Sequence, residues 1–485
     1  MKNMIFNSPL FLFLFLPFFF VIYFAADKNI RRVVGLIGSF LFFSWGQTLY
    51  IPLMAGVILW NYWVGCHLGK KEKKKRSKNL LWLGIAVNLT LLAGFKYITT
   101  YGVDWMLDWG LSQHLTGLLA ELGFPLGLSY ISFQTISYLV DVYKSHVESE
   151  EDLLNFALYI MLFPKILVGP ITRYRSVASS LSAPETNKED VADGIRRFIQ
   201  GLAKKILIAD VLATLVNAAF RLGAESLLPH VAWLAIIAYS LQIYFDFSGY
   251  TDMALGLGMM MGFRFEENFN FPYISQSISE FWRRWHISLS TWFRDYVFYP
   301  LERRRLKIIG QPLNIMIVFL LTGLWHGITP IFMLWGALHG IFLIIESLFL
   351  GRVLKKIFRP IRHLYALTSI LLTWIIFRSP SMQFAWDFVL RLLGVYETYT
   401  QPTFSHAPPL PFIEPSFLLA FFSGLLLSLP IVPYFEKVVS VYTERYPKAH
   451  FPLRIFTDSV LFILLLASLA MMASSKFNPG IYGGF

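Results

Sequence analysis

The chain has 485 residues, of which 56% are hydrophobic and only 15% are charged. Because a soluble domain carries about 25% charged residues, this composition excludes an ordinary soluble protein and indicates lipid as the solvent. The net charge of +12 is compatible with nucleic-acid binding, but the basic residues lie in short loops between apolar stretches, where they set membrane topology. We therefore expect the lipid bilayer as a partner and no nucleic acid.

Apolar stretches of about 20 residues recur along the chain, the length that crosses a hydrocarbon core of about 30 Å as a helix. Strands of an outer-membrane barrel alternate apolar and polar residues, whereas the run from Leu10 to Ala26 is unbroken. We therefore predict an all-α polytopic membrane protein. The single cysteine, Cys66, excludes an internal disulfide, and no His/Cys cluster in the sequence indicates a metal site.

The first helix is predicted over residues 6–26, and we expect it to be retained because Phe24 spoils a small-residue cleavage site. The apolar run 33–68 is too long for one span, so we divide it into two at Gly46-Gln47. Loops 27–32 and 70–78 then lie on the same side. Their basic residues predict that both are cytoplasmic and that the N-terminus is outside.

We expect one integral membrane domain over residues 1–485, with about ten to twelve transmembrane helices and some re-entrant segments. The later apolar segments lie near 80–99, 123–143, 153–171, 198–220, 229–262, 312–325, 331–350, 363–378, 413–434 and 453–474. Residues 103–122 are predicted to form an interfacial helix, and residues 184–197 a loop that leads into a basic amphipathic helix. The proline-rich segment 399–415 predicts an external loop.

Ionisable residues at membrane depth mark functional sites, and the stretch 277–299 is the richest in them. Its candidates for lining a substrate site or tunnel are Trp282, Arg283, Arg284, Trp285, Arg294 and Asp295, and His286 lies among them. If the stretch is one helix, Trp282 and His286 share a face. Such a helix can offer cations to a phosphate-bearing partner. The alternative is an aromatic-belt helix anchored by arginines.

A second stretch places His326 inside the membrane. Fourteen residues from Pro312 to Trp325 span about 21 Å as a helix, short of the roughly 30 Å needed to cross. Gly327 and Pro330 then interrupt the helix, and broken backbone at that depth is tolerated only where it is buried in protein or lines a wet cavity. Although a lone core histidine is usually structural, the depth, the break and the adjacent Trp325 favour a reaction centre.

Imidazole accepts a proton near neutral pH, so His326 can deprotonate a hydroxyl as it attacks an activated acyl carbon such as a thioester. His339 more simply packs within the next helix. A third polar group consists of Asp246, Ser248 and Asp252, for which we expect the arginines of 283–294 as partners and a structural or channel-lining role. Lys165 is expected near a lumen.

Five motifs resemble those of the membrane-bound O-acyltransferase family, and in particular its branch that acetylates exported polysaccharides such as alginate. They are PLGLSYISFQTISYLVDVY at 125–143, LFPKILVGPITR at 162–173, YFDFSGYTDMALGLG at 244–258, FWRRWHISLSTWFRDYVFYPL at 281–301 and LTGLWHG at 321–327. The resemblance implies N-terminal helices over 1–120, a catalytic core over 125–340 and C-terminal helices over 341–485.

The same resemblance implies a ring of helices around a tunnel, with His326 as the active-site residue and His286 as a second functional histidine on the donor side. It implies a cytoplasmic thioester donor such as acetyl-CoA or an acyl carrier protein, with no bound cofactor or metal. A bacterial inner-membrane location and a periplasmic or extracellular acyltransferase partner also follow. The tail 478–485 departs from the aromatic-rich ending of that branch.

Two alternatives remain open from the sequence. Within the family, the chain can instead transfer D-alanine to teichoic acid, although its length and the 244–258 motif favour polysaccharide acetylation. Outside the family, it can be a transporter with a histidine-gated pathway. A transporter needs coupling-ion carboxylates beside a broken helix pair, a requirement that Asp246 and Asp252 meet only weakly.

Overall fold

The computed structural model describes residues 4–69, 74–108, 123–222, 227–303, 310–395 and 413–474, and within these ranges every regular element is a helix. The first part of the chain forms α1 (Leu16–Ala25), α2 (Lys28–Ser44), α3 (Ile51–Gly69), α4 (Lys74–Asp108), α6 (Leu128–Tyr143), α7 (Leu153–Met161), α8 (Phe163–Ile166), α9 (Tyr174–Leu181), α10 (Lys188–Ala203), α11 (Asp210–Arg221) and α12 (Pro229–Met261). The prediction of an all-α fold is confirmed.

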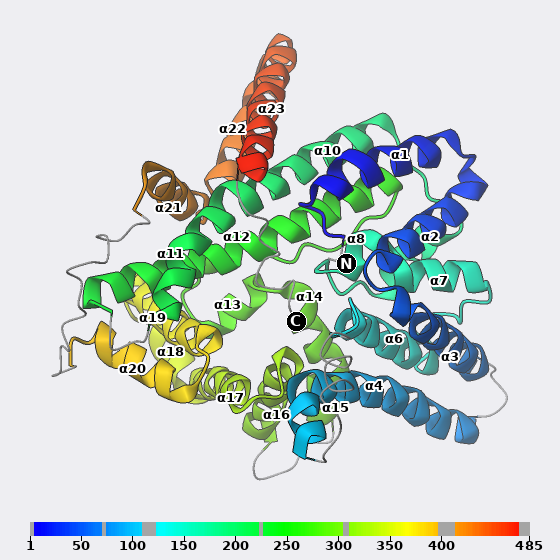
Figure 1. Cartoon of the computed structure of the whole chain (residues 1–485), viewed down its shortest axis with the longest axis horizontal. Coiled ribbons are helices and arrows are strands. Elements are labelled where there is room, and N and C mark those ends of the chain that lie inside the picture. Colours follow the sequence, from blue (N-terminus) through cyan, green and yellow to red (C-terminus); the bar gives the residue numbers. More distant parts are fainter. Residues whose placement is uncertain are drawn as a thin grey trace.

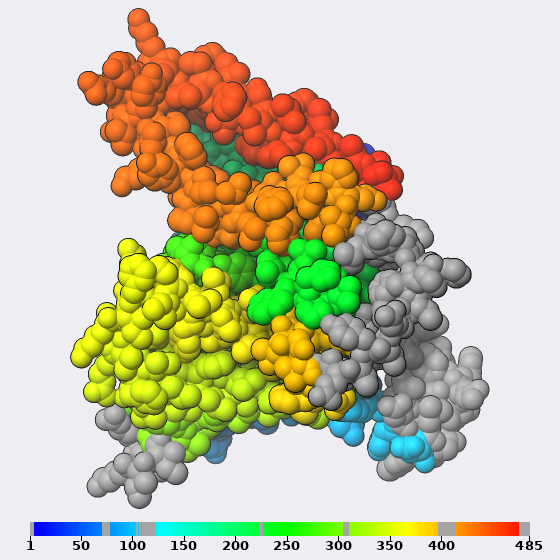
Figure 2. Space-filling view, turned by 90° about the vertical axis from the view of Figure 1, so that its left-hand side faces the viewer, coloured from blue at the N-terminus to red at the C-terminus, as the bar shows by residue number. Residues whose placement is uncertain are grey.

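The second part forms α13 (Ile278–Arg284), α14 (Ile287–Phe293), α15 (Tyr299–Glu302), α16 (Gly310–His326), α17 (Pro330–Ile345), α18 (Gly351–Leu354), α19 (Arg359–Arg378), α20 (Met382–Leu392), α21 (Pro415–Leu427), α22 (Ile431–Arg445) and α23 (His450–Ser474). In Figure 1 the longer helices surround the short helices α13 and α14, which lie near the middle of the view. In Figure 2 the C-terminal helices, orange to red, lie along the top of the molecule.

Six helical segments of the described chain are long and apolar enough to cross a membrane, and the bent pair α21–α22 makes a seventh if it is counted as one span. They are Thr48–Gly69, Lys78–Gly102, Pro229–Met261, Pro330–Leu354, Arg359–Arg378 and Pro447–Ser474. The chain is thus a multi-pass membrane protein. The count is below the expected ten to twelve because several other apolar segments form short or interrupted helices, such as α7 and α8.

The predicted N-terminal helices are present, with a difference at one boundary. Helical residues extend from a π-helical segment, Phe11–Phe15, through α1, and the break between α2 and α3 lies at the predicted Gly46-Gln47. Residues 28–32, however, are not a loop. They form the first turn of α2, because the carbonyl of Asp27 accepts hydrogen bonds from the amides of Ile30 (2.8 Å) and Arg31 (3.0 Å).

The polar segment 184–197 is also mostly helical. The Asn187 side chain accepts a hydrogen bond from the amide of Asp190 (2.7 Å) and starts α10 at Lys188, since such a cap satisfies a free helical N–H group. Of the predicted interfacial helix, residues 103–108 continue α4 and 109–122 lie outside the described residues. Residues 70–73 of the predicted loop 70–78, residues 399–412 of the proline-rich segment and the tail 478–485 also lie outside them. Residues 74–78 of that loop are helical and begin α4.

Helix α12 is the long buried helix of the fold, and α10 packs directly against its backbone. A Cβ atom on Gly194 would come within 2.6 Å of the Gly256 carbonyl oxygen, and one on Gly249 within 2.8 Å of the Gly201 oxygen. Both distances are shorter than real Cβ contacts. Glycines seven residues apart on each helix therefore permit the close approach of α10 and α12.

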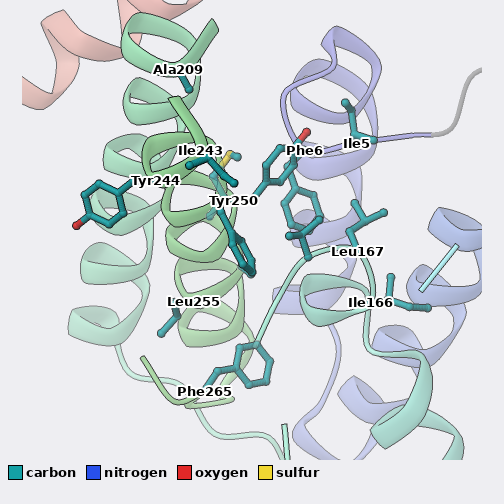
Figure 3. Packing of buried hydrophobic residues seen from close by; sticks show 14 of the residues in the cluster. Ile5, Phe6, Ile166, Leu167, Ala209, Ile243, Tyr244, Tyr250, Leu255 and Phe265 are labelled. Carbon is teal, nitrogen blue, oxygen red and sulfur yellow. The ribbon is translucent and has the colours of Figure 1, made fainter. Parts of the chain in front are cut away.

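The N-terminal segment is fixed to the opposite side of α12. Figure 3 shows Phe6 beside Tyr250 of α12, and their ring centroids are 6.3 Å apart. The Tyr250 hydroxyl donates to Asn7 Oδ1 (2.7 Å), and the Tyr23 hydroxyl donates to the carbonyl of Met261 (2.6 Å). The first helix and α12 thus form one packed unit.

Candidate active site

His326 ends α16, and α17 begins at Pro330, so the predicted helix break is confirmed. The two helices pack closely because Gly323 and Gly336 have no side chains, and a Cβ on either would collide with backbone carbonyl oxygens of the facing helix. This packing fixes the C-terminal end of α16 against α17 and so sets the position of His326.

Aromatic rings enclose the His326 imidazole. The ring centroids of Trp325, Trp335 and Phe377 lie 4.8, 5.0 and 5.2 Å from that of His326. His326 is 7% exposed, whereas the two neighbouring histidines of the cluster, His286 and His339, are each 1% exposed. His326 is therefore the most accessible of the three.

The two tryptophans connect His326 to the other two histidines. The centroid of Trp325 is 5.9 Å from that of His286, and the centroid of Trp335 is 4.8 Å from that of His339. We refer to His286, Trp325, His326, Trp335 and His339 as the histidine cluster. His286, which directly precedes α14, thus lies close to residues of α16 and α17. The sequence had linked His286 to His326 only through the family resemblance.

The stretch 277–299 is not one continuous helix, so the prediction that Trp282 and His286 share a helical face is wrong. Helix α13 ends at Arg284, His286 has left-handed backbone angles (φ 44°, ψ 54°), and α14 begins at Ile287. Backbone hydrogen bonds hold this bend. The amide of Asn270 donates to the Arg284 carbonyl (2.9 Å), and the amide of Ile287 donates to the Asn268 carbonyl (3.0 Å).

Asn268 is a residue of the site that the sequence did not reveal. Its side chain is fully buried, and its Oδ1 lies 3.2 Å from Nδ1 of His286. The same oxygen accepts hydrogen bonds from the backbone amide (3.1 Å) and the hydroxyl (2.9 Å) of Ser288. In the sequence it stands between Glu267 and Phe269 and belongs to no motif that indicates a site.

The remaining tryptophans of the predicted set lie beside the cluster. The indole N–H of Trp282 donates to Nδ1 of His339 (3.2 Å), which supports the packing role expected for His339. Trp285 stacks on Phe281 with centroids 5.5 Å apart. Both indoles are buried and help to enclose the cluster.

Several polar atoms of this region are buried without a hydrogen-bond partner among the described residues. They are His286 Nε2, His339 Nε2, Trp325 Nε1, Trp335 Nε1 and the hydroxyl of Tyr130, whose ring lies 5.8 Å from that of Trp325. An unsatisfied buried polar group costs about 1–3 kcal/mol, so such a concentration calls for a functional explanation. The cluster offers both proton acceptors and donors to a bound molecule.

The predicted arginines mostly bind the protein itself. Arg284 donates to Glu280 Oε1 (2.9 Å) and to the Asn270 carbonyl (3.0 Å), while Arg283 is exposed. Asp295 forms ion pairs with Arg294 (2.9 Å) and Arg173 (2.7 Å). Burial raises the pKa of the Asp295 carboxyl, but the hydrogen bonds from these two arginines outweigh it and leave the pKa below its ordinary value. Asp295 therefore stays ionised.

The predicted partners of the buried carboxylates are wrong. Asp246 pairs with Lys205 (2.8 Å), and Asp252 pairs with Arg197 (2.6 Å) and Lys204 (2.6 Å). These cations come from α10 and the π-helical segment that follows it, not from 283–294, because α10 is the helix that packs on α12.

Two further residues of the predicted set lie in the buried interior. Ser248 is buried, and its hydroxyl has no partner among the described residues. Lys165 is also buried. Its ammonium donates to Gln134 Oε1 (2.8 Å) and lies 4.2 Å from the centroid of the Tyr159 ring. In the part of the chain that the structure describes, no group of three His, Cys, Asp or Glu side chains is arranged to hold a metal ion.

Comparison with known proteins gives the chain a family. The model of MBOAT, the membrane-bound O-acyltransferase family, matches residues 75–385, which include the whole histidine cluster. A probable alginate O-acetylase of Pseudomonas aeruginosa is 40% identical over 390 residues, covering 79% of this chain and 74% of that protein. A peptidoglycan O-acetyltransferase of Helicobacter pylori is 33% identical over 427 residues, covering 81% and 80%.

A more limited similarity links the chain to a teichoic acid D-alanyltransferase of Bacillus subtilis, 32% identical over 238 residues that cover 46% of this chain and 59% of that protein. All three relatives are named as transferases of acyl groups. Together with the helical, multi-pass architecture, these matches identify the protein as a membrane acyltransferase: the chain belongs to the membrane-bound O-acyltransferase family.

Proposed function

We propose that this protein transfers an acetyl group from a cytoplasmic thioester across the membrane toward hydroxyl groups of an exported polysaccharide. The observation that carries the proposal is the histidine cluster, in which His326 ends a helix inside the protein and is the most exposed of three buried histidines. The expected helical ring would then enclose a tunnel in which donor and acceptor meet.

In the proposed reaction, His326 acts as the general base. A hydroxyl oxygen of the acceptor attacks the carbonyl carbon of the thioester while its proton passes to the imidazole. The carbon–sulfur bond then breaks, and the thiolate takes up the proton from the imidazolium. Acid–base catalysis of this kind contributes about 10²–10⁴-fold to a rate. The unpartnered N–H groups of Trp325 and Trp335 can hydrogen-bond oxygens of the substrates in this low-dielectric region.

Acetyl transfer to polysaccharide is favoured over D-alanyl transfer to teichoic acid. The two O-acetylating relatives match 79% and 81% of the chain, whereas the D-alanyltransferase matches 46%. The histidine-gated transporter is the weaker alternative, since Asp246 and Asp252 are neutralised by ion pairs with α10 and the segment after it and are not free to bind a coupling ion.

The donor is proposed to be acetyl-CoA or an acyl carrier thioester, and a periplasmic or extracellular acyltransferase is the proposed partner that completes transfer. We place the protein in the bacterial inner membrane, with the N-terminus outside and loop 70–78 in the cytoplasm. A cysteine at Lys78, in a Cys66→Ser background, tests this orientation. An impermeant maleimide should label this cysteine only after the cells are broken. Labelling in intact cells would show the opposite orientation of the protein.

The function is tested in cells that carry His326→Ala as the sole copy of the gene. Acetyl groups on the exported polysaccharide should fall by at least about a hundredfold, with the variant present in membranes at wild-type amounts. His67→Ala is the control, because this histidine is exposed and its Nδ1 lies 2.8 Å from the Trp63 carbonyl of its own helix. Undiminished acetylation with His326→Ala would refute the assignment.

A further inference from the structure

The side chain of Asn268 links His286, the residue at the bend, to Ser288 in the first turn of α14. Its Oδ1 is within hydrogen-bonding distance of the backbone amide of Ser288, the hydroxyl of Ser288 and Nδ1 of His286. The bend itself is a strained one, because a non-glycine residue at φ 44° occupies a conformation that L-residues seldom adopt. A fully buried side chain therefore supports an unusual backbone next to a candidate catalytic ring.

These contacts fix which atom of the Asn268 amide faces His286. The backbone N–H of Ser288 can only donate, so the atom that it meets must be the amide oxygen and not the nitrogen. An amide oxygen can only accept. Nδ1 of His286 must therefore carry a proton and donate it to Asn268, and the lone pair of the neutral ring lies on Nε2, the atom without a partner.

His339 has the opposite tautomer by the same reasoning. The indole N–H of Trp282 can only donate, and it points to Nδ1 of His339 (3.2 Å). The proton of neutral His339 is therefore on Nε2, which also has no partner among the described residues. Of the two histidines that flank His326 in the cluster, His286 can therefore accept a hydrogen bond at Nε2 and His339 can donate one at Nε2.

We infer that Asn268 is a positioning residue that holds the His286 ring on its bend with Nδ1 protonated, so that Nε2 is kept as an acceptor for a protic group of the substrates. This inference rests on the proposed function only in naming substrates as the source of that group. Asn268 touches no reacting atom. It acts through His286, as hydrogen-bonded carbonyl or carboxylate oxygens do for other functional histidines.

Nitrogen NMR of the purified full-length protein tests the inference without turnover. With ¹⁵N-labelled histidine, protonated and unprotonated ring nitrogens have distinct shifts, and His286→Gln and His339→Gln assign the two residues. We expect His286 with a protonated Nδ1 and His339 with a protonated Nε2 in the same spectrum, so that each is the control for the other. A protonated Nε2 with a bare Nδ1 in wild-type His286 would overturn the inference.

Two variants of Asn268 separate positioning from a general structural role. Asn268→Asp keeps the acceptor oxygen and loses no hydrogen bond to the described residues, among which Nδ2 of Asn268 has no partner. It should keep Nδ1 of His286 protonated and retain acetyl transfer within about threefold of wild type. Asn268→Leu cannot accept, so the His286 tautomer should become mixed and transfer should fall at least about tenfold.

The outcomes are distinct from those that test the function. If Asn268→Leu folds and leaves the His286 tautomer unchanged, or if folded Asn268→Asp is as inactive as Asn268→Leu, Asn268 does not position the ring. If Asn268→Leu does not fold, the wild-type spectrum and the Asn268→Asp variant still test whether Asn268 positions the His286 ring. Failure of acetyl transfer by the wild-type protein would instead refute the proposed function and leave the tautomers unaffected.

Discussion

Two buried regions of this protein differ in their ionisable side chains: in one the charged groups are paired, and in the other neutral histidines keep ring nitrogens without partners. Between α12 and the segment formed by α10 and the following π-helical turn, Asp246 and Asp252 are each within 3 Å of a basic group. In the histidine cluster, Nε2 of His286, Nε1 of Trp325 and Nε2 of His339 have no partner among the described residues. We propose that the paired groups stabilise the fold and that the unpartnered atoms bind substrates.

The physical reason for this difference is the cost of burial. An ion pair inside a protein loses much of its Coulombic gain to desolvation, but removal of one partner leaves a buried charge and costs about 3–5 kcal/mol. A neutral imidazole or indole without a partner costs about 1–3 kcal/mol and can regain it from a bound substrate. The first region therefore predicts loss of stability on mutation, and the second predicts loss of activity.

The largest effect is expected for Lys205→Met, which leaves buried Asp246 and the nearby Asp210 without their shared cation. We expect the free energy of unfolding to fall by about 3–5 kcal/mol, measured as a lower midpoint in thermal denaturation. The double variant Lys205→Met/Asp246→Asn removes one of the uncompensated charges and should recover part of the loss. A double variant no more stable than Lys205→Met would show that the ion pair is not what stabilises this contact.

The next effect is expected for His286→Ala, which removes a buried ring of the cluster whose centroid lies 4.7 Å from that of Phe247. Transfer per folded molecule should fall by about a hundredfold, equivalent to about 2.7 kcal/mol in the activation free energy, while the thermal midpoint falls less than that of Lys205→Met. The acetyl content of the polysaccharide and the denaturation midpoint are measured on the same variant. Wild-type transfer together with a large loss of stability would show instead that His286 has a structural role.

A smaller effect on stability is expected for Gly249→Ala, because its Cβ would meet the Gly201 oxygen at 2.8 Å and push α12 from α10. Forcing an atom into packed space typically costs about 1–3 kcal/mol. Gly56→Ala on α3 is the matched control, since its Cβ would meet nothing within 4 Å, and alanine in a helix is favoured by about 1 kcal/mol. Equal midpoints for the two variants would contradict the close-contact account.

The smallest effect is expected for Trp282→Phe, which loses the hydrogen bond to His339. About 1 kcal/mol of stability should be lost beyond the effect of ring size. Trp335→Phe makes the same change in ring size without losing a hydrogen bond, because Nε1 of Trp335 has no partner among the described residues. The hydrogen bond contributes nothing if both variants unfold at the same temperature.

Features of the fold that depend on local sequence could be predicted. Gly46-Gln47 divides the first long apolar run, and Gly327 with Pro330 ends α16 at His326, because glycine and proline act through the backbone of their own segment. The family resemblance added His286 and the acyltransferase activity. The histidines of the motifs at 281–301 and 321–327 then lie in one cluster.

Features that depend on contacts between distant segments could not be predicted. The bend at His286 contains no glycine or proline, and it forms because residues 268–270 hydrogen-bond to it. The carboxylates of α12 pair with α10 and the segment after it because two pairs of glycines bring these helices together. Neither contact is visible in the periodicity of a single segment, so Asn268 was missed and the partners of Asp246 were predicted wrongly.

The most direct test of the difference between the histidine cluster and the ion-paired region uses two purified variants, His326→Ala and Lys205→Met/Asp246→Asn. The acetyl groups transferred per folded molecule are measured for each, at matched amounts of folded protein. The account predicts at least about a hundredfold loss for His326→Ala and a rate within about threefold of wild type for the double variant, since its loss is in stability. A folded His326→Ala protein with the wild-type rate would contradict the account.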